Sequence, residues 1–195
     1  LDEGQQTIEI SEKRADLELD LVTHDIKKFI NLMLRRNGYV LEQLLSPLVL
    51  HSTEEHLELK EISKSCVTRH HSHHYLGFAQ NQWQLFEKER PRRIKPLLYV
   101  YRVLLTGIHL MRTGEVEANL LVLNEEFRLP FLAELVQKKV LGEQSTLEEP
   151  ELDFHAGVFE TLISRLEAAS EKSALPEAPS GRAALHDLLV RLRLG

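Results

Sequence analysis

The chain has 195 residues, of which 43% are hydrophobic and 28% charged, with 24 basic and 30 acidic side chains. This composition is typical of one folded domain, alone or with a small appendage, and it excludes a chain that is disordered throughout. The net charge of −6 argues against a protein that coats nucleic acid over its whole surface, but not against a local basic groove. Aromatic residues make up only 6%, so the composition predicts no base-stacking surface of the kind that single-strand binders use.

The single cysteine, Cys66, excludes an intramolecular disulfide framework and favours a reducing compartment. We interpret Cys66 as a small buried apolar residue near a helix end rather than a nucleophile. The apolar runs, such as 96–100 and 103–105, are far too short to span a bilayer, and no signal peptide is evident. We therefore expect a cytoplasmic protein without a membrane partner. Because the first residue is Leu1 rather than Met, we also expect a fragment or a processed form.

The first predicted element is a strand over residues 15–23, where leucines alternate with carboxylates. Thr23 is the predicted N-cap of a helix that ends at Asn37-Gly38. A short helix over 40–45 and a short strand over 48–51 follow. Ser52 and Glu55 have the spacing of a capping box, which predicts a helix from there to about Val67.

The remainder is predicted to be helical, with the helices over 69–88, 91–112, 124–141 capped by Asn124, 150–173 opened by Pro150, and 183–194. A linker rich in proline and glycine occupies 175–181. The predicted fold class is therefore mainly α with a small β remnant. The predicted organisation is a remnant domain over 1–51, a helical domain over 52–174, and a linker with a tail helix over 175–195.

Two stretches of the sequence could take part in binding or transferring phosphate groups. Asp16, Glu18 and Asp20 would share one strand face, where hard carboxylate oxygens can hold Mg²⁺, although the same alternation is typical of any half-exposed strand. Lys95 and Arg102 are two helical turns apart and would share a face that grips a triphosphate or a nucleic-acid backbone. The alternative for these basic residues is solvated surface, or an ion pair between Arg102 and an acidic neighbour.

Three further features have weaker interpretations. His70, His71, His73 and His74 include an i,i+4 pair that could bind Zn²⁺, but a third ligand is missing and we interpret them as a polar helix start. Arg102 and His109 have a spacing that would suit a helical RNA-binding or RNA-cleaving module. The basic helix and the leucine-rich tail helix would instead suit a non-catalytic interaction domain, although packing within the chain is favoured for the tail.

Several segments in order resemble a known family. They are 20–29 (DLVTHDIKKF), 37–47 (NGYVLEQLLSP), 74–82 (HYLGFAQNQ), 95–105 (KPLLYVYRVLL) and 113–115 (TGE). The series is similar to the bacterial and phage nucleotidyltransferases of the DNA polymerase beta superfamily, of the type found beside RNA-repair genes. The similarity covers about 16–121. Gly38 stands where that family has a proline.

The resemblance implies an α+β fold in the intact protein, with this chain contributing the helical C-terminal domain. Members of the superfamily carry a Gly-Ser turn and an Asp-x-Asp pair, and neither occurs before Asp16. We therefore expect the chain to be an incomplete, inactive portion of a longer enzyme. In this alignment Asp20 matches the third catalytic carboxylate, with Glu18 as the alternative if the register differs.

The resemblance also implies a reaction. An acceptor hydroxyl, such as that of an RNA end, would attack the α-phosphate of an NTP, and pyrophosphate would leave. The implied cofactor is Mg²⁺, with Asp20 as a metal ligand. Lys95 and Arg102 are the expected nucleotide-binding residues, because their positive charge would neutralise the phosphates.

Overall fold

The computed structural model describes residues 6–142, 145–147 and 151–195. The described residues are mainly helical, as predicted, with a single two-stranded antiparallel sheet. The elements are β1 (Thr7–Arg14), β2 (Leu17–His24), α1 (Ile26–Leu34), α2 (Gly38–Leu44), α3 (Glu54–Lys64), α4 (His71–Lys88), α5 (Ile94–Thr113), α6 (Leu120–Phe127), α7 (Pro130–Leu141), α8 (Glu151–Lys172) and α9 (Arg182–Leu194). None of the helices in these residues is long and apolar enough to cross a membrane.

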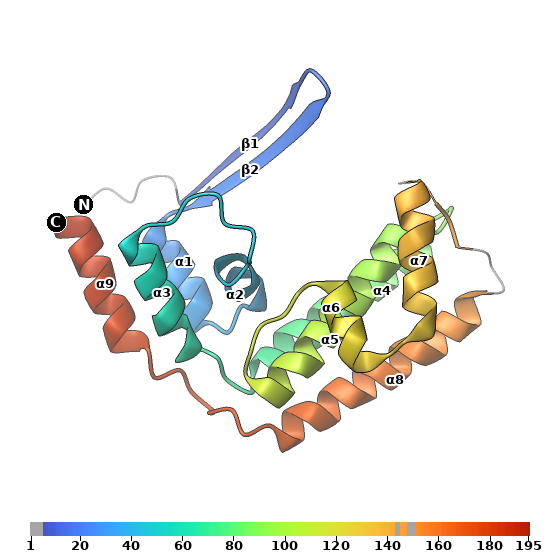
Figure 1. Cartoon of the computed structure of the whole chain (residues 1–195). Coiled ribbons are helices and arrows are strands. Elements are labelled where there is room, and N and C mark those ends of the chain that lie inside the picture. Colours follow the sequence, from blue (N-terminus) through green and yellow to red (C-terminus); the bar gives the residue numbers. More distant parts are fainter. Residues whose placement is uncertain (1–5, 143–144, 148–150) are drawn as a thin grey trace.

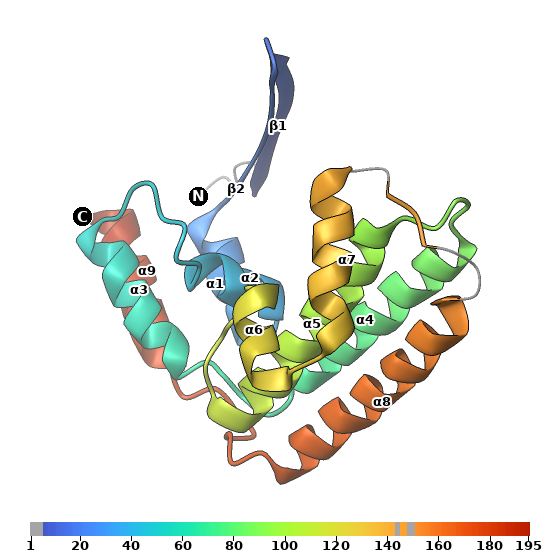
Figure 2. The same ribbon diagram turned by 45° about the vertical axis from the view of Figure 1, so that its right-hand side comes forward.

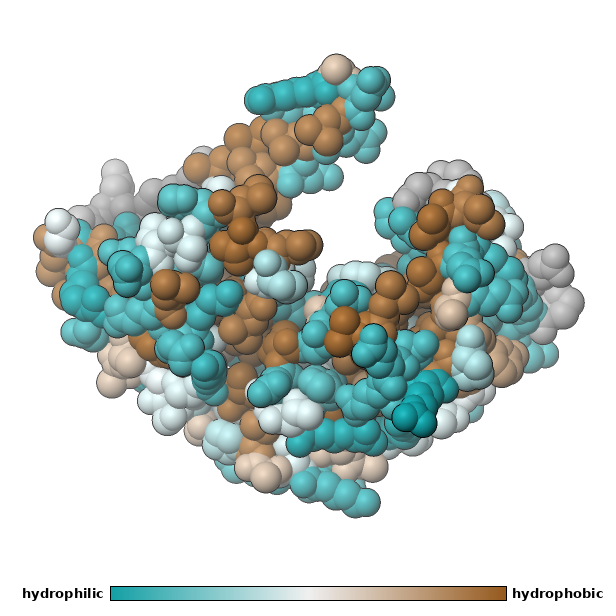
Figure 3. Space-filling view, in the orientation of Figure 1, coloured by the Kyte–Doolittle hydropathy of each residue, from teal (hydrophilic) through white to brown (hydrophobic). Residues whose placement is uncertain are grey.

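The strands β1 and β2 form a hairpin that projects from the helices (Figure 1). The predicted strand over 15–23 is therefore confirmed as β2, and its partner β1 was not predicted. The register pairs Ile8 with Thr23 and Ile10 with Leu21, so one face of the hairpin is mainly apolar. These isoleucines and Leu21 remain exposed. Figure 3 shows the hairpin as a separate projection with hydrophobic surface along it, and an open gap between the hairpin and α7.

The helical core is built around α5. Val100, Leu104, Leu105 and Ile108 of this helix are fully buried, because α4, α6, α7 and α8 all pack against α5 (Figure 2). The helix ends at Gly114, whose φ of 78° lies in the left-handed region that favours glycine.

The other helices surround the base of the hairpin. Helix α1 packs against α2 and α9, and α9 also packs against α3 (Figure 1). Leu185 and Leu188 of α9 are buried there, as expected for packing within the chain. Although α3 falls in the predicted domain over 52–174, it lies beside the tail helix. The predicted domain boundaries stay a prediction.

Several predicted helix starts are wrong because a neighbouring side chain makes the capping bond. Asp25, not Thr23, caps α1 by accepting the backbone N–H of Lys27 at 2.9 Å, while Thr23 still belongs to β2, opposite Ile8 of β1. Thr53, not Ser52, caps α3 through the N–H of His56 at 3.2 Å. The predicted strand over 48–51 is also wrong, since these residues form a loop.

The predicted helix over 124–141 is divided into α6 and α7. Asn119 caps α6, whereas the Asn124 side chain accepts the backbone N–H of Leu129 at 2.9 Å. Arg128 adopts a left-handed conformation with φ of 52°, which ends α6, and Pro130 then begins α7. Pro150, the predicted start of the next helix, lies outside the described residues.

Candidate functional site

The polar face of the hairpin carries the predicted catalytic carboxylates. The register places Ser11 opposite Asp20 and Lys13 opposite Glu18, so Asp20 and Glu18 share a face, as expected from the strand period. Asp16 does not belong to this face, because it lies in the turn where Ala15 has a φ of 52°. The predicted face of three carboxylates is therefore wrong in that respect.

Asp20 is exposed and has one direct partner among the described side chains. The Ser11 hydroxyl donates a hydrogen bond of 2.6 Å to Oδ1 of Asp20. The other carboxylate oxygen, Oδ2, has no hydrogen-bond partner among the described residues. An exposed carboxylate with one open oxygen can accept a proton or bind a cation.

The donor set around Asp20 does not by itself fit a Mg²⁺ site. Mg²⁺ demands near-octahedral oxygen coordination and is usually held by protein carboxylates together with phosphates and water. Over the described ranges, no three His, Cys, Asp or Glu side chains converge on a position that could hold a metal ion. Glu18, the nearest carboxylate along β2, faces Lys13 across the hairpin. The magnesium site therefore stays a prediction.

The predicted nucleotide-binding residues both lie on α5, away from the hairpin strands (Figure 1). Lys95 is exposed in the first turn of the helix, and Arg102 is half-buried two turns later. Nη1 of Arg102 lies 2.5 Å from Oε2 of Glu42 on α2. Although burial opposes it, the Glu42 carboxylate raises the pKa of Arg102. Arg102 thus has an acidic partner, one of the alternatives that the sequence left open.

Aromatic side chains gather around Arg102. Its guanidinium carbon lies 4.6 Å from the ring centroid of Tyr99, which is cation–π geometry. Tyr99 meets Phe78 of α4 edge-on at 5.6 Å between centroids, and Phe78 is stacked with His74 at 6.2 Å. Tyr39 of α2 borders the same small hollow and is 50% exposed. We call Tyr39, His74, Phe78, Tyr99 and Arg102 the aromatic–arginine face.

The aromatic–arginine face was not predicted, because a low aromatic content averaged over the chain does not report local clustering. Part of it had a signal in the sequence: Lys95, Tyr99 and Arg102 have i,i+4 and i,i+3 spacing and so share one side of a helix. Tyr39 and Glu42 come from α2, about 60 positions earlier than Arg102, and no spacing rule connects them to α5.

His70 and His71 of the 70–74 cluster have different polar partners, and the ring of His70 also stacks on that of His73 at 5.7 Å between centroids. Nε2 of His70 lies 2.6 Å from Oε2 of Glu177, in the segment before α9. Nδ1 of His71 is 3.1 Å from the backbone nitrogen of Thr68, which donates to it. Burial raises the pKa of the Cys66 thiol, which fits a buried apolar role and not a nucleophile.

The pair predicted for an RNA-cleaving module is divided between two acidic partners. Nδ1 of His109 lies 2.8 Å from Oε2 of Glu126 on α6, whereas Arg102 is held by Glu42. The acidic partners of the two side chains lie on different helices, so the geometry does not bring Arg102 and His109 together at one site.

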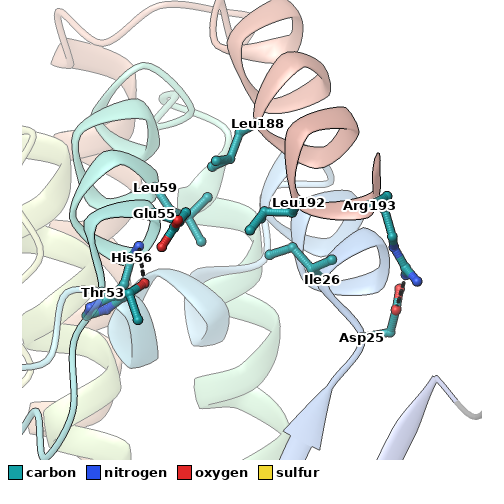
Figure 4. A pocket seen from close by; sticks show the side chains of 9 residues that line it. All are labelled: Asp25, Ile26, Thr53, Glu55, His56, Leu59, Leu188, Leu192 and Arg193. Carbon is teal, nitrogen blue, oxygen red and sulfur yellow. Dashed lines mark hydrogen bonds and ion pairs between the residues drawn. The ribbon is translucent and has the colours of Figure 1, made fainter. Parts of the chain in front are cut away.

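A separate hollow of about 440 Å³ lies where α9 meets α1 and α3 (Figure 4). Its floor is apolar, with Ile26, Leu59 and Leu188, and one end carries an ion pair between Asp25 and Arg193. Burial acts to raise the pKa of Asp25, but hydrogen bonds from Lys28 and Arg193 lower it. The hollow forms where the tail helix α9 docks. None of the predicted site residues lines it.

Comparisons with known proteins agree with the ordered series of segments. The uncharacterized protein MJ0002 of Methanocaldococcus jannaschii is 34% identical over 100 residues, which cover 51% of this chain and 41% of that protein. The matched region thus spans about two-fifths of the relative. No solved structure matches the chain. The RlaP family, described as the RNA repair pathway DNA polymerase beta family, matches residues 3–191. The chain therefore belongs to the RNA repair pathway DNA polymerase beta family.

Proposed function

We propose that this chain belongs to a nucleotidyltransferase, an enzyme that transfers a nucleotidyl group from an NTP to the hydroxyl of an RNA end. The observation that carries the proposal is the family match over residues 3–191, which includes the hairpin, α1 to α8 and all but the last three residues of α9. In this reaction the acceptor oxygen bonds to the α-phosphorus, the bond to the β-phosphate oxygen breaks, and pyrophosphate leaves with that electron pair.

The proposed catalytic carboxylate is Asp20. Its exposure on the hairpin and the open Oδ2 support a role beside the attacking hydroxyl, whose proton a carboxylate can accept. Glu18 shares the same face and is the alternative. Mg²⁺ is the proposed cofactor of the whole enzyme, with Asp20 as one ligand. The described residues do not supply the rest of its coordination.

The proposed phosphate contacts are Lys95 and Arg102. Both are positively charged and lie on one side of α5, and the side chain of Arg102 keeps 21% exposure beside Glu42. Preorganised cations of this kind stabilise the negative charge that accompanies phosphoryl transfer.

A transfer assay tests the proposal. The natural full-length protein is incubated with labelled NTPs and an RNA oligonucleotide, with Mg²⁺ or with EDTA. We expect labelled RNA and pyrophosphate with Mg²⁺ only. RNA shortening that EDTA does not stop and that His109→Ala removes would instead support the cleaving module. Absence of both reactions, together with no NTP binding by calorimetry, would support an interaction domain.

A further inference from the structure

We propose that the aromatic–arginine face binds an unpaired nucleobase of single-stranded RNA. The inference rests on the proposed function for the presence of RNA and adds where and in which form the RNA is held. Its observations are the ring contacts, the Arg102–Tyr99 stack and the nearby Lys95, none of which depends on the hairpin.

The rings of this face are only partly buried, so they remain accessible from solvent. Tyr39 is half-exposed, and His74, Phe78 and Tyr99 are each partly buried, so packing restrains these rings while part of each reaches solvent. By contrast, Tyr75 beneath them is almost completely buried. Rings held rigidly at a surface can stack on a base with little loss of conformational freedom, and every base has a flat face to offer.

The charges around the face suit a nucleic-acid strand. Arg102 is fixed over Tyr99 by Glu42, and a guanidinium plane stacks on bases as aromatic rings do. Glu42 offsets part of the charge of Arg102, so the guanidinium contributes to strand binding mainly by stacking, and the charge that it keeps is the one proposed to contact phosphate in the transfer reaction. Lys95, one helical turn before Tyr99, is a second basic residue on this side of α5, where a phosphate next to the stacked base would lie.

These features select single-stranded over double-stranded RNA. In a duplex the bases are stacked on each other and their faces are closed, so a ring at the protein surface has nothing to stack on. A duplex would meet only the charge of Lys95 and its neighbours. Stacking also predicts tolerance of sequence, because the face is built from ring planes and not from groups that read base edges.

The test is binding of a fluorescein-labelled oligo(rA) strand by fluorescence anisotropy, with an RNA duplex of equal length as a second probe. Tyr39→Ala should weaken strand binding about tenfold, the size expected for the loss of one stacked base. Tyr39→Ala should leave duplex binding unchanged. Tyr39→Phe keeps the ring and should bind the strand as tightly as the wild-type protein. Phe154→Ala is the matched control, because Phe154 is a similarly exposed ring on α8, at 53%, outside this face.

Two further variants probe the parts of the face. Tyr99→Leu keeps apolar volume against Phe78 and should also weaken strand binding, with circular dichroism checking that the helices are intact. Lys95→Gln should weaken both probes and lower the salt dependence by about one ion.

The inference is overturned if Tyr39→Ala and Tyr99→Leu leave strand binding unchanged, or if Tyr39→Ala weakens the strand and the duplex equally. Because the assay needs no NTP, its outcome is independent of the transfer reaction. Strand binding that Tyr39→Ala and Tyr99→Leu leave unchanged, in an enzyme that labels RNA, would reject this inference alone. Intact stacking in a protein that transfers nothing would reject the proposed reaction alone.

Discussion

The carboxylate of Glu42 on α2 and the guanidinium of Arg102 on α5 form an ion pair of 2.5 Å, with side-chain exposures of 12% and 21%. This contact connects the α1–α2 segment, which follows the hairpin directly, to the central helix of the core. Burial and the Glu42 carboxylate also raise the pKa of Tyr75, whose ring lies below the pair. The pair therefore helps to hold α2, which carries Tyr39, against α5, which carries Tyr99 and Arg102.

Glu42→Gln should lower the free energy of unfolding by about 2 kcal/mol, because it leaves the half-buried Arg102 without a counter-charge. Urea titration followed by circular dichroism measures the change. Glu61→Gln is the control: Glu61 pairs with Lys64 at 2.7 Å, but both side chains are mostly exposed, so little change is expected. Equal effects of the two substitutions would show that the Glu42–Arg102 pair has no special structural role.

Gly38→Ala should destabilise the fold by about 2 kcal/mol through overpacking. A Cβ at position 38 would lie 2.7 Å from the ring of Tyr75, which is almost completely buried and therefore has little room to move. Gly77→Ala is the matched control within α4. Apart from the adjoining residues and the backbone of α4 itself, no described atom lies within 4 Å of a Cβ there, so alanine should stabilise the helix by about 0.5–1 kcal/mol. Thermal unfolding of both variants checks the opposite signs.

Stability should fall on acidification because His71 is buried in its neutral form. Desolvation lowers the pKa of His71 from 6.5 to about 4, and its Nε2 is buried without a hydrogen-bond partner among the described residues. A lowered folded-state pKa gives stability that is present above the unfolded value and is lost as the pH falls toward the folded value. The window is therefore 6.5 down to about 4.

Urea titrations at about pH 7.5 and about pH 5 should differ by about 2 kcal/mol on account of His71. His71→Gln should reduce this difference, whereas His73→Gln, which changes an exposed residue, should preserve it. Some dependence should remain in His71→Gln because burial also lowers the pKa values of His74 and His155. An unchanged difference in His71→Gln would contradict the assignment.

Local signals in the sequence predicted the helices well but not their ends. The periodicity of apolar residues located α1 and α9, because each of these helices buries one side against its neighbours. The ends depend on which of two adjacent side chains makes the capping bond. Asp25 rather than Thr23, and Thr53 rather than Ser52, could not be chosen without the geometry of the preceding strand or loop.

The candidate site was predictable only where it depends on one element. Strand alternation correctly placed Glu18 and Asp20 on one face, and helical spacing placed Lys95 and Arg102 on one side of α5. The partners were missed because they come from other elements. Ser11 reaches Asp20 from β1, and Glu42 reaches Arg102 from α2; both contacts arise from tertiary packing.

The most direct test of the account is the transfer assay with Asp20→Asn in the natural full-length protein. The amide keeps the size of the side chain and can still contact Ser11, but it loses the negative charge and the ability to accept a proton. Glu12→Gln is the control, since Glu12 pairs with Leu19 on the opposite face of the hairpin. The account predicts that Asp20→Asn abolishes labelling of RNA while Glu12→Gln retains it. Wild-type labelling by Asp20→Asn would contradict the assignment of Asp20, and its loss in Glu18→Gln instead would move the catalytic role to Glu18.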